Sequence, residues 1–332
     1  MSIRQEKSQE LSEVNLSELS IEQIKSLSHE WNLDGDQWKI LEKDDRIGAR
    51  KLAEQACQRR ERVRKEKVRQ DKCLHYERKF WSAGLNYVAG VDEVGRGCLA
   101  GPVVAAAVIL SSKFDLPGLN DSKKLSKIKR AELDKAIREQ AISFSCFEVE
   151  AKRIDAINIL QASLEAMRNT LLALKTKPQQ VLVDGHIKPQ SSFPEMPIVD
   201  GDSRSLSIAA ASVVAKVYRD QKMCELDLIF PGYGFAKNKG YGSPQHLSAL
   251  SVKGVTPEHR KSFGPVGAVL KKQQNLFESF FGKINSCRDL TRLYEVGQDI
   301  NLSKSRLDFK KLEELRASYR SRKDLIQNNK IK

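Results

Sequence analysis

Two apolar runs separated by a glycine-rich turn dominate the hydrophobic pattern of the chain between Tyr87 and Leu110. The first run, YVAGV, leads directly into the adjacent carboxylates Asp92 and Glu93, and the second, PVVAAAVIL, is almost wholly Val, Ala and Ile. Apolar runs of this kind are typical of strands that are buried on both faces of a sheet. The stretch therefore predicts two strands at the centre of a sheet, with two carboxylates where the first strand ends.

Helical and strand-like patterns alternate after this pair, which predicts an α/β fold. The elements expected are, in chain order, a helix over 126–140 capped by Ser126, a strand over 141–150, an amphipathic helix over 154–175, short strands ending near Asp184 and Asp200, a helix over 205–230, a short helix beginning at Ser243 and an amphipathic helix over 266–284.

Carboxylates recur where the predicted strands end. Asp184 follows the apolar run VLV, and Asp202 comes just before the helix over 205–230. Because functional groups of α/β sheets gather at strand ends, we expect Asp184 and Asp202 to lie with Asp92 and Glu93. Four clustered carboxylates cannot all stay ionised without a cation, and two Mg²⁺ or Mn²⁺ ions would suit phosphoryl displacement. The alternatives are a solvated Asp-Glu pair and, for Asp202, a simple N-cap of the following helix.

The glycines after the first carboxylate pair offer a different interpretation, a dinucleotide-binding loop. That loop requires G-x-G-x-x-G at the start of a helix. Here Gly95 and Gly97 are followed by Gly101 one position late, and the sequence beyond Pro102 has the pattern of a strand. We therefore disfavour a nicotinamide cofactor.

The charge and the cysteine pattern narrow the class of protein. Lysine and arginine exceed aspartate and glutamate by 57 to 43, a net charge of +14, which favours nucleic acid over an inert basic surface. The six cysteines form no C-x-x-C and the five histidines no H-E-x-x-H, so we expect a hard metal ion with oxygen ligands. The N-terminus lacks a signal-peptide pattern and no apolar run is long enough for a bilayer, so we expect a cytoplasmic protein that contacts no membrane.

Basic residues also gather in three segments outside the predicted strands. Residues 48–80 form a highly charged helical pattern that indicates either a solvated linker or an arm that grips phosphates. Tyr241 lies in a loop rich in glycine and lysine, where a tyrosine either packs inward or stacks on a sugar or base. Lys123 ends a loop, where its ammonium could meet a phosphate or be no more than solvated surface. His259 and Arg260 are interpreted as structural residues that hold a loop.

Five motifs of the chain resemble those of bacterial ribonuclease HII, in the same order over about residues 86–265. They are YVAGVDEVGRGCLAGPVVAAAVIL, NDSKKLS, VLVDG, GDSRSLSIAAASVVAKVYRD and GYGFAKNKGYGSPQHL. The resemblance implies an RNase H-like fold with a central mixed sheet flanked by helices. It implies an endonuclease that uses Mn²⁺ or Mg²⁺ to cleave RNA in RNA–DNA hybrids. It also implies cleavage on the 5′ side of single ribonucleotides embedded in duplex DNA, leaving 3′-hydroxyl and 5′-phosphate ends, for ribonucleotide and primer removal during DNA repair and replication.

The resemblance also implies roles for individual residues. Asp92, Glu93, Asp184 and Asp202 match the catalytic acids of the family, which bind two metal ions. The residues that match its nucleic-acid contacts are Gly95, Arg96 and Gly97 for the 2′-hydroxyl, Tyr241 for the sugar at the ribonucleotide–deoxynucleotide junction and Lys123 for a phosphate. Glycine suits the first of these roles because it lets a backbone approach a sugar closely.

Two positions depart from the family pattern. Asp200 stands where a lysine commonly precedes Gly-Asp, which adds negative charge beside Asp202, and His186 follows Asp-Gly where asparagine is frequent. The N-terminal extension resembles those of some longer members only loosely, and the basic C-terminal tail matches none.

We divide the chain into a charged, mostly helical extension over 1–85, a catalytic domain over 86–265 and C-terminal helices with a basic tail over 266–332, and we expect a monomer. Two other functions are open at this stage. A nucleic-acid-binding protein on an inactive nuclease scaffold would lack one of the four acids. A hybrid nuclease that cuts only runs of ribonucleotides would lack the G-R-G element or its tyrosine. This chain has all of them.

Overall fold

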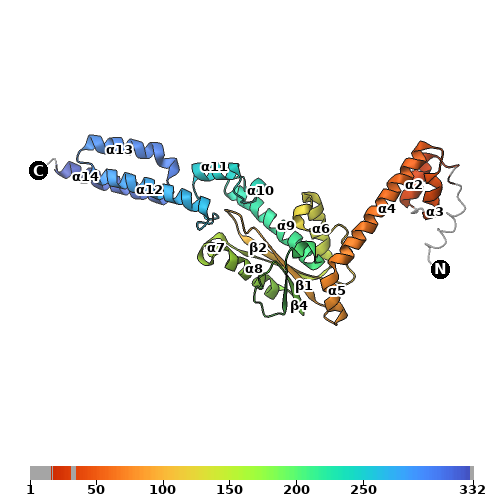
Figure 1. Cartoon of the computed structure of the whole chain (residues 1–332). Helices are drawn as coiled ribbons and strands as arrows, with labels where there is room; N and C mark the ends of the chain where they lie inside the picture. The colour runs from red at the N-terminus through yellow and green to blue at the C-terminus, as the bar shows by residue number, and fades with distance from the viewer. Residues whose placement is uncertain (1–15, 17, 31–34, 330–332) are drawn as a thin grey trace. The chain divides into compact units, whose positions relative to one another are not determined.

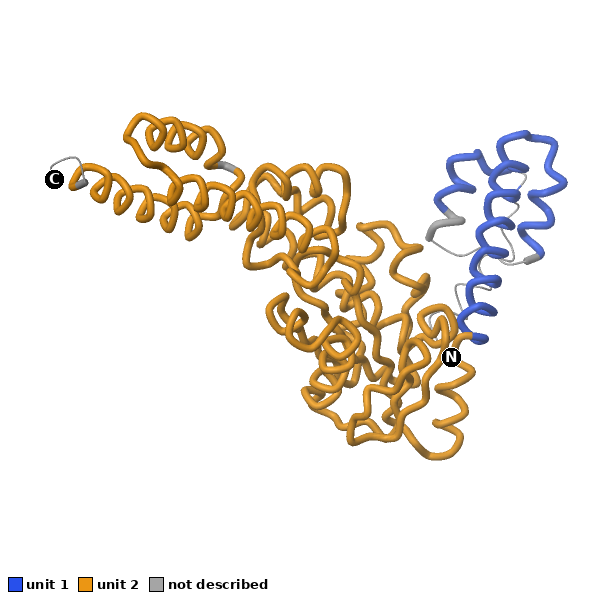
Figure 2. The backbone as a smooth tube through the Cα atoms, turned by 60° about the vertical axis from the view of Figure 1, so that its left-hand side comes forward, with its two compact units in different colours: residues 1–72 blue, residues 73–332 orange. Residues whose placement is uncertain are grey.

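The computed structural model describes residues 16, 18–30 and 35–329, which form two compact units divided between Lys72 and Cys73 (Figures 1 and 2). Residues 1–15, at the start of the predicted extension, lie outside the described residues. Among the described helices, none combines the length and the apolar character needed to cross a membrane. The division of the chain at residues 85 and 265 stays a prediction.

The first unit consists of the helices α2 (Ile21–Glu30), α3 (Gly35–Glu42) and α4 (Ile47–Cys73). Its core is small and includes Ile24, Trp38, Leu41, Ala49 and Ala53. α2 begins with a reciprocal cap, because Ser20 Oγ accepts a bond from Gln23 N and Gln23 Oε1 accepts one from Ser20 N.

The prediction of one continuous helical pattern over 48–80 is wrong in one respect. α4 ends at Cys73, and a separate helix, α5 (His75–Ser82), follows after Leu74. Neither glycine nor proline marks this break, because it depends on packing against the sheet. Leu74 packs against the core between the sheet and α9, and Tyr76 packs against the cluster that includes Val88 and Leu182. Acidic and basic side chains pair along α4, as in Arg64–Glu61 at 2.9 Å, so its two interpretations as linker and arm both remain open.

The second unit contains a five-stranded mixed sheet with the order β3-β2-β1-β4-β5. The strands are β1 (Val88–Val94), β2 (Val103–Leu110), β3 (Ala141–Val149), β4 (Gln180–Asp184) and β5 (Glu195–Ile198). β1 pairs antiparallel with β2, and β2 with β3, whereas β4 runs parallel to both β1 and β5. The predicted central position of the first apolar run and the mixed sheet are confirmed.

Helices cover both faces of this sheet (Figure 1). The residues of β2 alternate between the two cores, with Val104, Ala106 and Val108 on the side of α9 (Leu206–Ile229) and α6 (Lys127–Gln140). Ala105, Ala107 and Ile109 face α7 (Ala151–Ile157) and α8 (Ile159–Ala173). Both faces of β2 are therefore buried, which explains its unbroken apolar sequence.

α9 lies very close to β1 because a glycine faces it. A Cβ atom on Gly90 would come within 2.1 Å of the carbonyl carbon of Ser207. The small residues Ala209, Ala210 and Ala211 in the next turn of α9 are all buried in the same core. This close contact fixes the start of α9 against the strand that carries the first two carboxylates.

The predicted single helix over 154–175 is interrupted. Asn158 has a φ of +67°, separates α7 from α8, and caps α8 by accepting a bond from Gln161 N. The apolar pattern continues across the break and gives no sign of it. By contrast, the predicted cap Ser126 of α6 is confirmed. The short helix predicted to begin at Ser243 is also confirmed as α11 (Pro244–Lys253), with Ser243 as its cap.

The C-terminal region folds into helices with a core of their own. After α10 (Phe235–Asn238) and α11 come α12 (Gly264–Ser286), α13 (Leu290–Ser303) and α14 (Phe309–Asn329). Apolar residues from all three long helices form one cluster, which includes Phe280, Ile284, Val296, Leu315 and Ile326. The region is thus a small helical bundle.

Candidate active site

Three of the four predicted acids come from adjacent parallel strands. β1 and β4 run side by side with Val91 opposite Val183, so the residues that follow, Asp92 and Asp184, lie at the same edge of the sheet. Glu93 is next along β1, and its backbone N donates to Asp92 Oδ1 at 2.7 Å. The strand itself continues to Val94, one residue beyond the carboxylates.

Asp202 reaches this edge from the connection between β5 and α9. It lies in the short 3₁₀ helix Gly201–Ser203, and Gly201 N donates to Asp184 Oδ1 at 2.7 Å. The N-cap of α9 is Ser205, whose side chain accepts a bond from Ile208 N. The alternative in which Asp202 simply caps the helix is therefore wrong.

The electrostatic state of Asp92 shows that the acids act on one another. Asp92 is 5% exposed. Burial raises its pKa well above the ordinary value, and the charges of Glu93, Asp184 and Asp202 raise it further, against a hydrogen bond from Ser212 that lowers it. Such a carboxyl ionises fully only when positive charge is nearby.

Two basic side chains supply part of that charge. Arg96 Nη1 lies 3.1 Å from Glu93 Oε1, and this contact opposes the burial that raises the pKa of Glu93. Lys123 Nζ lies 3.7 Å from Asp202 Oδ2 while its side chain stays 82% exposed. Burial alone would lower the pKa of Lys123, but Asp202 and the neighbouring acids raise it. Both cations are therefore within reach of the cluster and of solvent.

Asp121 is a further acid that sequence reasoning missed. It is 8% exposed, and after burial it is the main cause that raises the pKa of Asp202. Its side chain also accepts a bond from Lys123 N, which holds the loop that carries the lysine. Asp121 stands in the NDSKKLS motif, but no local pattern in the sequence links it to Asp202.

The two departures from the family pattern lie at the margin of the site. Asp200 is exposed and has a φ of +52°. His186 is exposed and lines a hollow of about 90 Å³ together with Glu93, Arg96 and Asp184. Among neighbouring carboxylates, the largest effect on the pKa of Asp202 comes from Asp121.

The four acids suit a hard cation in their chemistry, but their side chains are not arranged around a single point that would enclose an ion. All four side chains offer carboxylate oxygens, which are the ligands that Mg²⁺ and Mn²⁺ prefer. Among the residues that the structure describes, however, no three His, Cys, Asp or Glu side chains are grouped closely enough to hold an ion as they stand. Arg96 and Lys123 each pair with one of the acids instead.

The G-R-G turn is held from beneath by two buried arginines. Arg219 donates to the carbonyls of Pro102 and Ala100, and Arg260 donates to those of Gly101 and Arg96. Both guanidinium groups are fully buried, so these main-chain bonds compensate the cost of removing their charges from water. The structural role predicted for Arg260 is confirmed, whereas that of Arg219 was missed.

Glycine is required at the start of this turn. Gly95 has a φ of +94°, and a Cβ atom there would lie 2.2 Å from Arg219 Nε. Gly97 has room around it, and the atom nearest to an added Cβ would be Tyr241 Cε1 at 3.9 Å. The structure therefore brings Tyr241 beside the G-R-G turn, as the resemblance implied.

The two tyrosines of the glycine-rich loop have different environments. Tyr233 is buried and donates from its hydroxyl to Gly254 O, so it packs inside the loop. Tyr241 is 45% exposed, and its carbonyl is bonded to His246 Nδ1 at 2.8 Å. Of the two interpretations offered for such a tyrosine, the inward-packing one fits Tyr233, and Tyr241 remains available to a ligand.

The comparisons with family models and with known relatives agree on one family. The family model described as "Ribonuclease HII" matches residues 89–266, and that of the "Ribonuclease HII N-terminal domain" matches residues 20–81. The ribonuclease HII of Desulfitobacterium hafniense is 48% identical over 228 residues, 69% of this chain and 88% of its own length. That of Bacillus cereus is 46% identical over 239 residues, 72% of this chain and 93% of its own length.

Two solved structures are also similar. The crystal structure of the ribonuclease H2 from Pyrococcus horikoshii OT3 gives a TM-score of 0.49 at 25% identity, over 56% of this chain and 97% of that one. The RNase HII of Archaeoglobus fulgidus, solved as a complex with PCNA, gives 0.47 at 27% identity, over 54% of this chain and 95% of that one. Both TM-scores lie below 0.5, so the assignment rests on the sequence comparisons. Those comparisons cover more than half of the chain and nearly the whole length of its relatives, and the chain therefore belongs to the ribonuclease HII family, as an endonuclease of the ribonuclease H type.

Proposed function

We propose that this endonuclease cleaves duplex DNA on the 5′ side of a single embedded ribonucleotide, as well as RNA in RNA–DNA hybrids, and leaves 3′-hydroxyl and 5′-phosphate ends. Its role would be the removal of ribonucleotides and primers during DNA repair and replication. The observation that carries the proposal is the convergence of two features at one edge of the sheet. The acids of β1 and β4 lie there, and the glycine turn beside Tyr241 directly follows β1.

Asp92, Glu93, Asp184 and Asp202 would hold two divalent ions, Mn²⁺ or Mg²⁺. Such ions, when bound, activate a water for attack on the phosphorus and stabilise the departing oxygen. The raised pKa of Asp92 supports this role, because burial beside other carboxyls disfavours its charge until a cation is present.

Lys123 would contact a phosphate of the substrate. Its ammonium contacts Asp202 at 3.7 Å, but the side chain is 82% exposed, so little is lost when it turns to another anion. Arg96 is also half exposed and pairs with Glu93. We assign the phosphate contact to Lys123 and the positioning of Glu93 to Arg96.

The turn over 95–97 would recognise the 2′-hydroxyl through its backbone. Gly97 leaves space beside Tyr241, and the carbonyl of Arg96 is fixed by Arg260 at 2.8 Å. A rigid backbone acceptor or donor distinguishes a ribose from a deoxyribose without reading the base, because only the ribose carries the 2′-hydroxyl. The Tyr241 ring would then pack on the next sugar.

The decisive experiment uses a DNA duplex with one ribonucleotide, with Mn²⁺ or Mg²⁺, and maps the products at nucleotide resolution. We expect one cut on the 5′ side of the ribonucleotide. Asp92→Asn should abolish cleavage while binding to the duplex persists. Asp200→Asn is the matched control, because it removes an exposed acid at a left-handed position that asparagine tolerates, and it should cleave at the wild-type rate.

A second substrate separates the proposal from the alternatives. If the wild type cleaves only a continuous RNA strand in a hybrid, the acids keep their role and the assignment of the 95–97 turn and Tyr241 fails. If Asp92→Asn cleaves as well as the wild type, the site itself is wrongly assigned. If the wild type binds both duplexes and cleaves neither with either metal, the protein acts as a nucleic-acid-binding protein.

A further inference from the structure

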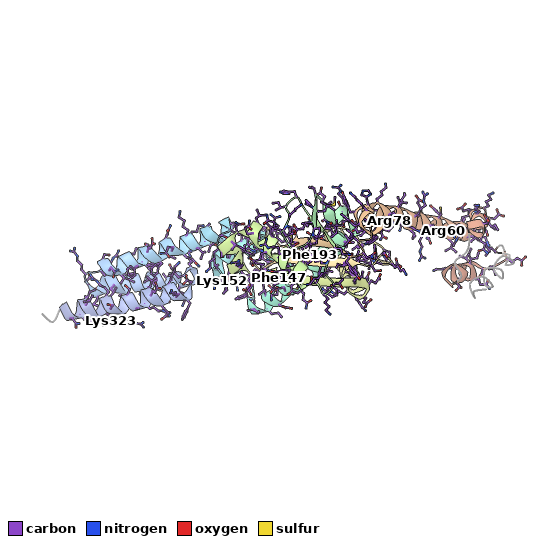
Figure 3. All side chains as sticks on the ribbon, turned by 90° about the horizontal axis from the view of Figure 1, so that it is seen from below. Arg60, Arg78, Phe147, Lys152, Phe193 and Lys323 are labelled. Atoms are coloured by element: carbon purple, nitrogen blue, oxygen red, sulfur yellow. The ribbon has the colours of Figure 1, made fainter. Side chains whose placement is uncertain are left out.

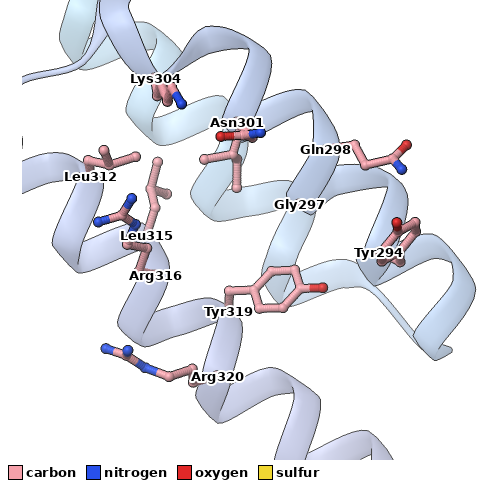
Figure 4. Close-up of a pocket in the computed structure, with 11 residues that line it drawn as sticks. Tyr294, Gly297, Gln298, Asn301, Lys304, Leu312, Leu315, Arg316, Tyr319 and Arg320 are labelled. Atoms are coloured by element: carbon pink, nitrogen blue, oxygen red, sulfur yellow. The ribbon is translucent and has the colours of Figure 1, made fainter.

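We propose that a groove between α13 and α14 binds a single-stranded segment of nucleic acid, at a site separate from the active site (Figure 4). The groove has a volume of about 390 Å³, within the usual range for sites that take a group the size of a nucleotide. It lies beyond residue 266, outside both segments that the family models match. The proposal therefore does not depend on the proposed cleavage reaction.

The groove forms because α13 and α14 each bury one face in the core of the helical bundle and leave the adjacent face open to solvent. Leu293, Val296 and Ile300 of α13 and Leu315 of α14 are buried in the helical bundle. The residues that line the groove come from the neighbouring positions, namely Tyr294, Gln298, Asn301, Lys304, Arg316, Tyr319 and Arg320, with apolar residues at its floor.

A glycine shapes the groove. A Cβ atom on Gly297 would lie 2.8 Å from Tyr319 Cε2, so only glycine lets the Tyr319 ring lie this close to α13. Figure 4 shows the ring of Tyr319 extending toward Gly297 and Tyr294, with Arg320 on the next position of α14. An aromatic face is thus presented inside a groove that is open to solvent.

The charge of the groove has one sign. Three cations line it, Lys304, Arg316 and Arg320, and no carboxylate does. Arg316 pairs with Glu313 at 2.6 Å, whereas Lys304 and Arg320 form no ion pair with any residue that the structure describes. The surrounding region is basic too, with 15 Lys and Arg against 8 Asp and Glu over residues 266–332, which gives +7 of the total +14. Such a groove attracts an anionic chain.

The uncharged groups indicate which anion is bound. The exposed ring of Tyr294 offers a face on which a base can stack, and the half-buried ring of Tyr319 lines the groove beside it. Stacking on aromatic residues is the common mode of single-strand binding. The side-chain amides of Gln298 and Asn301 have no hydrogen-bond partner among the described residues, so their donors and acceptors are available to the edge of a base. An acidic peptide would use the cations and could use the amides, but it offers no base to stack on the exposed ring. A duplex would offer phosphates but no free base face. We therefore assign the groove to unpaired nucleotides.

The test measures binding of a fluorescent oligothymidine to the full chain by anisotropy, in EDTA so that no strand is cut. The groove variant is Lys304→Gln with Arg320→Gln. The matched control is Lys310→Gln with Lys323→Gln, which removes the same charge from exposed positions outside the groove (Lys323 is labelled in Figure 3). We expect the groove variant to bind about tenfold more weakly and the control to change less than about threefold.

A third variant separates stacking from charge. Tyr294 is 63% exposed, so Tyr294→Ala should fold normally. It should weaken binding severalfold without changing the salt dependence, because a stacked ring releases no counterions. The groove variant should instead reduce the slope of log affinity against log salt by about 1.4, since each phosphate contact on a single strand contributes about 0.7.

Three outcomes would overturn the proposal. The first is equal weakening by the groove and control pairs, which would indicate a diffuse effect of charge. The second is displacement of the oligothymidine by poly-glutamate at the same charge concentration, which would indicate an acidic polypeptide as ligand. The third is unchanged binding of Tyr294→Ala. Cleavage of a short one-ribonucleotide duplex by the groove variant should match the wild type, and a wild type that fails to cleave would count against the proposed function alone.

Discussion

A pair of buried histidines beneath Tyr241 allows a quantitative test of how its loop is held. His259 Nδ1 accepts from Thr256 N at 3.0 Å, so the proton of this ring lies on Nε2, which donates to His246 Nε2 at 3.0 Å. His246 then donates from Nδ1 to the carbonyl of Tyr241 at 2.8 Å. This chain of bonds exists only while both rings are neutral.

The magnitude follows from the pKa of His259. Burial, with a smaller effect from His246, lowers this pKa from 6.5 to about 4. Because the folded value lies below the unfolded one, the stabilisation is complete above pH 6.5 and is lost as the pH falls toward 4. A difference of this size corresponds to about 3 kcal/mol of unfolding free energy, of which about 2 kcal/mol is lost by pH 5.

The assay is urea unfolding at pH 7 and pH 5 for the wild type, His259→Asn and His75→Gln. We expect the wild type to lose about 2 kcal/mol more between the two pH values than His259→Asn, which has no imidazole to protonate there. His75 is exposed, so His75→Gln is the matched control and should follow the wild type.

Nuclear magnetic resonance gives an independent measurement, because the chain has only five histidines. The ε1 proton of His259 should show no titration between pH 5 and pH 8. A midpoint near 6.5 for His259, or the same pH dependence of stability in the wild type and His259→Asn, would refute the reasoning.

Three further predictions concern two single contacts and the metal dependence of the site. Gly90→Ala places a methyl group 2.1 Å from the Ser207 backbone and should lower the free energy of unfolding by about 3 kcal/mol or more. Gly282→Ala is the control, because its methyl meets nothing within 4 Å and should stabilise the helix slightly. Equal melting temperatures of the two variants would contradict this prediction. Glu77→Leu removes the acceptor of Ser205 Oγ and Ser207 N and should cost about 2 kcal/mol. Burial raises the pKa of Glu77, so wild-type stability should fall as the pH rises through that pKa, and Glu77→Gln should abolish this slope in urea unfolding. Excess EDTA should abolish cleavage, and added Mn²⁺ should restore it; cleavage that persists in EDTA would contradict a metal-dependent site.

Much of the fold could be predicted because its signals are local. The apolar runs of β1 and β2 have no polar interruption, since both faces of the central strands are buried. The serines at 126 and 243 cap helices through bonds that span three residues. The position of Asp184 at the end of a short apolar run was also readable, because strand ends are marked in the sequence by a change from apolar to polar residues.

Most of the errors have a physical origin in long-range contacts. The break at Leu74 has no glycine or proline, and α5 is separate because its residues pack against the sheet. The break at Asn158 is the exception, since a local cap to Gln161 N accompanies it. Arg219 could not be assigned from the sequence, because its partner Pro102 is 117 residues away. In the same way, Asp121 acts on Asp202 across a distance in sequence that no local pattern covers.

The sequence by itself determined the alternation of strands and helices and the family, and it named the candidate acids, since each depends on residue type and spacing along the chain. Only the tertiary structure decided which charges meet. The pairing of Lys123 with Asp202 follows from the loops that surround the edge of the sheet, whereas Arg96 and Glu93 are only three residues apart. The same folding leaves Tyr294 exposed at an open groove, whereas Tyr319 lines that groove while its ring also packs against the core of the bundle. How strongly a charged group or an aromatic ring interacts depends on its burial and on its neighbours, and both are properties of the folded chain.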